Sequence, residues 1–174
     1  MAASVVFVCM APPRVDVVAV EEARSLLRTC CGSSRWVELM LQRRPFGTTE
    51  ALIRQSEEVW FSLTPADWRE AFGDHPKIGD REALKMRFAE TRHLASREQA
   101  GVETAPAVVL DALAQGNREY ERRFGYIFIV CATGLSAEEM LARLQARLAN
   151  DPASELRVAA GEQSKITSLR LRQL

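Results

Sequence analysis

Helix-start signals recur along this chain and constrain its fold more than any other feature. Thr64-Pro65 places a capping hydroxyl before a proline at the first helical position, and Asp151-Pro152 repeats the arrangement with a carboxylate. Ser136 and Glu139 have the spacing of a capping box, in which each side chain binds the other residue's free backbone N–H. Apolar residues recur at helical spacing behind these signals. The chain is therefore predicted to be mostly helical.

The helices expected from this pattern have clear limits. Ser34 is expected to cap the second helix and Thr48 the third, and Ser96–Gln99 has the form of another capping box. Gly161 is a position where the last helix could bend or split. The expected helices cover 20–31, 34–41, 49–63, 65–72, 82–94, 106–123, 137–148 and the chain from 152 onward.

One stretch does not have a helical pattern. Tyr126–Cys131 is β-branched and aromatic, carries no charge, and lies between Gly125 and Gly134. A single strand has no sheet to join in a helical protein, so we expect a buried extended segment. The predicted fold is an all-α, single-domain bundle of about seven to nine helices with that one buried segment.

The charge balance limits the classes of partner. The chain has 23 Lys and Arg against 23 Asp and Glu residues in 174. This balance argues against nucleic acid and against an anionic membrane, which both attract proteins through bulk basicity. A local basic cluster remains compatible with a small anionic substrate.

The four cysteines predict neither a disulfide framework nor a metal site. Cys30 and Cys31 are adjacent, and no pair has the C-x-x-C spacing of a zinc ligand set. Four reduced thiols indicate a cytoplasmic protein, and Cys131 is expected to be a core thiol. The apolar N-terminus is too short to span a bilayer, so residues 1–16 are expected to form a flexible extension and 17–174 the domain.

The turn Asp74–Asp80 holds the strongest candidate for chemistry. It contains His75, one of only two histidines, followed by Pro76 and, three residues later, Gly79. An imidazole exchanges protons near neutral pH, and loops on a rigid scaffold often carry function. The alternative is a turn histidine that binds a backbone carbonyl. The other histidine, His93, is expected to be a solvated helix residue.

Several short motifs follow one another along the sequence and together identify a family. They are Cys31–Trp36, Arg44–Phe46, His75–Asp80, Glu98–Gly101, and Asn117, Tyr120 and Arg123–Gly125 leading into Phe128–Ala132. The set resembles the 2-oxo-4-hydroxy-4-carboxy-5-ureidoimidazoline (OHCU) decarboxylases of urate breakdown. The family commonly has a serine three residues before the glutamate, whereas this chain has Ala95 there and Ser96 next to it.

The resemblance implies an all-α homodimer without metal or organic cofactor, which converts OHCU to carbon dioxide and (S)-allantoin. It also implies that His75 is the proton donor, and Glu98 is the second candidate for a catalytic residue. A carboxylate beside an imidazole can hold its tautomer or raise its pKa. Glu98 could instead bind substrate N–H groups, or only favour a helix dipole.

The remaining expected contacts bind the substrate. Gln99 offers donors and an acceptor to a ureido group, although it could be only the capping partner of Ser96. An extended segment exposes backbone groups to a flat, amide-rich ring, and Arg170 would bind the substrate anion, with Arg172 as a substitute. The expected substrate-binding residues are Pro76, Gln99, Phe128, Ile129, Val130, Cys131, Ala132 and Arg170.

Three other functions compete with this hypothesis. A related helical enzyme could act on another hydantoin-like or β-keto acid, and a non-catalytic module could keep the fold. His75 together with Glu98 argues against a mere scaffold. A cysteine hydrolase would need a Cys–His pair that the sequence does not suggest.

Overall fold

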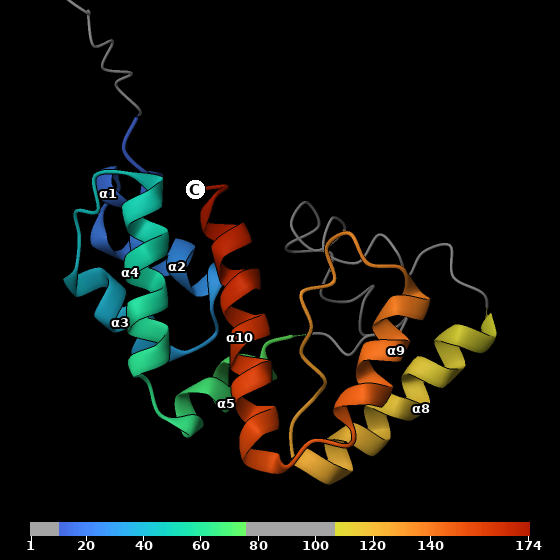
Figure 1. Cartoon of the computed structure of the whole chain (residues 1–174). Coiled ribbons are helices and arrows are strands. Elements are labelled where there is room, and N and C mark those ends of the chain that lie inside the picture. The colour runs from blue at the N-terminus through green and yellow to red at the C-terminus, as the bar shows by residue number, and fades with distance from the viewer. Residues whose placement is uncertain (1–10, 76–106) are drawn as a thin grey trace, which may run out of the picture.

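The protein is mostly helical in the part of the chain that the computed structural model describes, which is residues 11–75 and 107–174 (Figure 1). These two ranges hold eight helices and no strand, and the all-α prediction is confirmed. The helices are α1 (Arg14–Val17), α2 (Val20–Cys30), α3 (Ser34–Gln42), α4 (Thr49–Ser62), α5 (Pro65–Gly73), α8 (Ala107–Phe124), α9 (Ala137–Arg147) and α10 (Pro152–Leu171).

Most of the predicted caps are present. Thr64 with Asp67, and Ser136 with Glu139, form complete capping boxes, and the Asp151 carboxylate accepts from two N–H groups of α10. One prediction was wrong, because Ser33 rather than Ser34 caps α3. The predicted helix 82–94 and the box at Ser96 lie outside the described residues.

Helix α10 occupies the centre of the fold. It contacts α2, α4 and α5, and Figure 1 shows it between those helices and the α8–α9 pair. The Trp60 indole of α4 donates to the carbonyl of Ala160 at 2.8 Å. Gly161 does not split the helix, which runs unbroken through that residue. A central helix is buried on most sides, so polar side chains on it need partners inside the protein.

Helices α8 and α9 pack closely because one glycine makes room. A Cβ atom on Gly116 of α8 would lie 2.6 Å from a methyl carbon of Leu144 on α9. The residue therefore costs helix propensity but permits a short helix–helix distance. Between the two helices the chain runs through residues 126–132 without forming helix or strand. Phe128, Ile129 and Val130 are each at most 5% exposed, which confirms the buried extended segment.

The folded domain begins before residue 17. Val15 is fully buried, and the Arg14 N–H donates to the carbonyl of Leu174 at 3.0 Å. The Asp16 carboxylate accepts from the N–H groups of Phe46 and Gly47. Residues 14–16 are thus bound to the last residue of the chain and to the loop between α3 and α4, although the sequence analysis assigned them to the extension. No helix among the described residues has the length and apolar character needed to cross a bilayer.

Candidate active site

His75 follows the C-cap residue of α5 and is half-buried. Its N–H donates to the carbonyl of Phe72 at 3.2 Å, so the backbone continues the last turn of the helix. Asp74, the C-cap residue of α5, lies against Gly32 in the turn between α2 and α3. The position of His75 is therefore set by a helix end docked on another element.

Arg170 reaches the same region from the last turn of α10. Its Nη1 atom lies 3.5 Å from the carbonyl oxygens of Thr29 and Cys30, at the C-terminal end of α2. Contacts of this length are weak hydrogen bonds, but a helix C-terminus attracts a cation. The structure thus brings the turn before His75 and the Arg170 guanidinium to one place, residues 29–32. Glu98, Gln99 and Pro76 lie outside the described residues, and their roles stay predictions.

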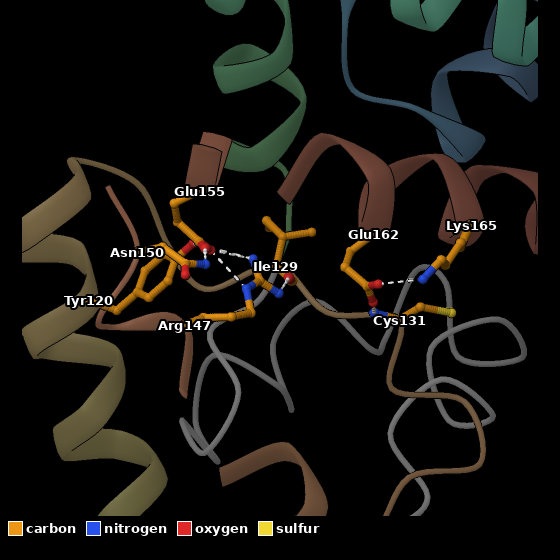
Figure 2. A network of polar contacts seen from close by, with 8 residues as sticks. All are labelled: Tyr120, Ile129, Cys131, Arg147, Asn150, Glu155, Glu162 and Lys165. Atoms are coloured by element: carbon orange, nitrogen blue, oxygen red, sulfur yellow. Dashed lines mark hydrogen bonds and ion pairs between the residues drawn. The ribbon is translucent and has the colours of Figure 1, made fainter. Parts of the chain in front are cut away.

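The extended segment is anchored along one edge of its backbone (Figure 2). Arg147 donates to the carbonyl of Ile129 at 2.8 Å, and the N–H of Cys131 donates to the Glu162 carboxylate at 2.8 Å. Residues two apart in an extended chain direct their backbone groups to the same side. The groups of Phe128 and Val130 therefore point to the other side. No hydrogen bond between described residues engages them.

The anchor at Ile129 belongs to a buried ion pair. Two nitrogens of the Arg147 guanidinium lie 2.8 and 2.5 Å from one oxygen of Glu155, which is fully buried. Tyr120 donates to the same oxygen, and the Asn150 amide donates to the other at 2.7 Å. Burial, reinforced by the bond to Glu155, raises the pKa of Tyr120 above its usual value. The phenol therefore stays protonated and acts as a donor.

Glu162, the second anchor of the extended segment, lies on α10, as does Glu155. Burial alone would raise the pKa of this carboxyl group, but the Lys165 ammonium at 2.6 Å and the Cys131 N–H together lower it. The carboxylate is thus ionised at neutral pH, and an ionised acceptor forms a strong bond to a backbone N–H.

No disulfide joins Cys30, Cys31 and Cys131, the cysteines in the described ranges. Burial raises the pKa of Cys31 to about 12, so its nucleophilic thiolate is scarce at neutral pH. Cys131, predicted to be a core thiol, is only half-buried. Within those ranges no group of three His, Cys, Asp or Glu side chains could hold a metal ion.

Sequence reasoning missed Arg147, Glu155 and Glu162. Arg147 lies in the last turn of α9 and Glu155 in the first turn of α10, where charges of these signs favour the helix dipole. Their positions therefore gave no reason to expect a buried ion pair. A signal did exist in α10, where Glu155, Ala159, Glu162 and Ile166 recur at helical spacing and all four are buried. Carboxylates that alternate with small or apolar residues on one helix face indicate buried acids with partners.

Comparison with known proteins identifies the family. The sequence model described as OHCU decarboxylase matches residues 17–172. The chain belongs to the OHCU decarboxylase family. It is 33% identical over 131 residues to the 2-oxo-4-hydroxy-4-carboxy-5-ureidoimidazoline decarboxylase of Amia calva, covering 75% of this chain and 74% of that protein.

Another relative of the family is longer. The uric acid degradation bifunctional protein TTL of Arabidopsis thaliana is 37% identical over 158 residues, which are 90% of this chain and 48% of that protein. The chain thus spans about half of the bifunctional relative and about three quarters of the Amia protein.

Two solved structures share the fold. A crystal structure of OHCU decarboxylase in the presence of (S)-allantoin superposes with a TM-score of 0.74 at 35% identity, covering 90% of this chain and 97% of that one. A crystal structure of (S)-allantoin synthase has a TM-score of 0.68 at 18% identity, covering 91% and 52%, and supports the fold alone.

Proposed function

We propose that this chain decarboxylates OHCU to (S)-allantoin in urate breakdown. The observation that carries the proposal is the similarity to an OHCU decarboxylase crystallised in the presence of (S)-allantoin, which extends over almost all of that chain. The match of the family model over residues 17–172 supports it independently.

The proposed chemistry needs little from the protein beyond orientation and one proton. When the carboxylate leaves as carbon dioxide, its bonding electrons pass into the unsaturated carbon–nitrogen unit of the substrate ring. The substrate thus supplies the electron sink that pyridoxal phosphate or thiamine provides elsewhere, and we propose that no cofactor takes part. A proton then enters one face of the ring and fixes the configuration of allantoin.

His75 is proposed to deliver that proton. A half-buried imidazole at the end of a docked helix has a defined position, and general acid catalysis by such a group contributes roughly a hundredfold to ten-thousandfold to a rate. Glu98 is proposed to hold the imidazole in the required tautomer. The proximity of the His75 turn and Arg170 to the Thr29–Gly32 turn supports a shared site.

The substrate is proposed to lie between Arg170 and the extended segment. Arg170 would bind the carboxylate, since a guanidinium offers paired donors to an anion. The substrate would contact the backbone edge opposite to the two anchors, which belongs to Phe128, Val130 and Ala132. Ile129 and Cys131 already use backbone groups on the anchored side. Pro76 and Gln99 would complete the site beside His75.

The proposal extends to assembly and location. By the family resemblance the active form is a homodimer, and the lack of a disulfide among Cys30, Cys31 and Cys131 suits the reducing cytoplasm. Equal numbers of acidic and basic residues favour a small-molecule substrate over nucleic acid or a membrane surface.

Freshly made OHCU tests the proposal directly. OHCU is generated from urate by urate oxidase and hydroxyisourate hydrolase, and its absorbance and circular dichroism are followed with and without the protein. The expected result is faster loss of OHCU with formation of (S)-allantoin alone. An unchanged decay that yields racemic allantoin would refute the decarboxylase function and favour another acid substrate or a non-catalytic module.

A further inference from the structure

The end of α5 is seated on the α2–α3 turn by a contact that leaves no room for a side chain. A Cβ atom on Gly32 would lie 2.7 Å from Cγ and 2.8 Å from Cβ of Asp74. Positive φ values among the described glycines occur at Gly47, Gly125 and Gly134. Gly32 is therefore required here for space and not for an unusual backbone conformation.

A second contact holds α5 one turn earlier. The Glu70 carboxylate accepts from the backbone N–H of Ser34 at 3.2 Å and from its hydroxyl at 2.6 Å. Glu70 and Asp74 are four residues apart, so they lie on the same face of α5. Two contacts separated by a helical turn fix both the rotation of α5 and its position along its axis.

Arg28 connects the two contacts. Its Nη1 atom donates to the Ser34 hydroxyl at 2.8 Å, and its Nη2 atom lies 3.5 Å from the Asp74 carboxylate. Both side chains of the Arg28–Asp74 pair are about half exposed, and such pairs contribute little stability. The steric fit at Gly32 is therefore the stronger constraint on Asp74.

We propose that Gly32, Asp74 and Glu70 are positioning residues for His75, an inference that rests on the proposed decarboxylase function. His75 follows Asp74 directly in the chain, so a displaced Asp74 displaces the imidazole. The clash at Gly32 involves the Cβ atom of Asp74, which a change of side-chain rotamer does not move. A methyl group on residue 32 therefore needs a backbone shift at that contact, and we infer that the shift reaches Asp74, which directly precedes His75. Misplacement of a catalytic group by about 1 Å can cost about a hundredfold in rate.

The test compares alanine at two glycines. Gly32→Ala is expected to lower kcat about tenfold to a hundredfold, because the imidazole is moved, in a protein that stays folded at the assay temperature by circular dichroism. Gly73→Ala is the matched control. Gly73 immediately precedes Asp74, and a Cβ there would meet nothing within 4 Å, so kcat should stay near the wild-type value.

A second background isolates the contact with Asp74. In an Asp74→Gly variant the clashing atoms are absent, so adding Gly32→Ala should change kcat less than twofold. The two substitutions would then be non-additive, as expected for residues in contact. Equal losses from Gly32→Ala in both backgrounds would overturn the inference, as would wild-type turnover by Gly32→Ala.

A readout without turnover separates this inference from the proposed function. The chain has two histidines, so a His93→Gln background leaves one imidazole signal in the proton spectrum. Gly32→Ala should shift that signal, as should Glu70→Ala, which removes a contact without adding atoms, and Gly73→Ala should not. An unshifted signal in both test variants contradicts the inference. An inactive wild-type protein contradicts the decarboxylase proposal instead.

Discussion

Arg147 and Glu155 form an ion pair at the junction of α9 and α10, with a closest distance of 2.5 Å between nitrogen and oxygen. Glu155 is fully buried and the Arg147 side chain is 12% exposed. The same guanidinium donates to the carbonyl of Ile129 and lies 4.7 Å from the centre of the Phe128 ring. One pair thus joins two helices and fixes the extended segment of the candidate site.

Removing the charge of Glu155 should destabilise the protein strongly. In Glu155→Gln the Arg147 cation stays buried without its counter-ion, and breaking one partner of such a pair costs about 3–5 kcal/mol. Urea unfolding monitored by circular dichroism measures the loss. Glu138→Gln, at an exposed position in α9, is the control and should change stability by less than about 0.5 kcal/mol. A Glu155→Gln protein as stable as wild type would show that the pair is dispensable.

Glu162 should contribute stability that depends on pH. Its pKa is lowered in the folded protein, so the stabilisation is present above the unfolded value, about 4.3, and is lost as the pH falls through the folded value. Glu162→Gln should therefore be less stable than wild type by about 1–3 kcal/mol at pH 7, as expected for a hydrogen bond to a charged group. Urea unfolding at pH 7, 5 and 3 tests this, because the difference should shrink at pH 3. A constant difference would assign the effect to packing.

Local features could be predicted from the sequence, and contacts between distant residues could not. The capping boxes at Thr64 and Ser136 were correct because each depends on residues three apart. Choosing Ser34 as the cap of α3 failed because its hydroxyl binds Glu70, 36 residues away. Glu162 binds the backbone of Cys131 across 31 residues, and Glu155 binds Tyr120 across 35. Periodicity in one helix carries no information about such partners.

In the candidate site too, the residues expected to contact the ligand could be predicted from the sequence, and the residues that position them could not. The family resemblance pointed to Arg170 and to residues 128–132. It did not point to Arg147 and Glu162, which bind the backbone of the extended segment. Gly32 directly follows the predicted helix 20–31, and its steric role is visible only in the structure, where Asp74 lies against it. A short motif identifies residues that could contact a ligand, whereas the residues that position them are scattered along the chain.

Arg170 should bind the substrate anion rather than serve the fold. Arg170→Ala is expected to raise KM for OHCU by about tenfold to a hundredfold, since a hydrogen bond between charged groups is worth about 1.5–3 kcal/mol. Arg172→Ala provides the matched control, because Arg172 is two residues further along and exposed. An unchanged KM in Arg170→Ala with a raised KM in Arg172→Ala would reverse the two assignments.

His75 should be essential for turnover but not for folding. His75→Ala removes the imidazole and keeps the backbone N–H that bonds to Phe72, so helical circular dichroism and Tm should stay close to wild type. The kcat should fall by about a hundredfold to ten-thousandfold, the usual contribution of a general acid. His93→Ala, at a position expected from the sequence to face solvent, should keep full activity. If His75→Ala still formed (S)-allantoin at the wild-type rate, another group would have to deliver the proton. If allantoin formed slowly and as a racemate, OHCU would be decaying in solution, as expected once the enzyme's proton donor is gone.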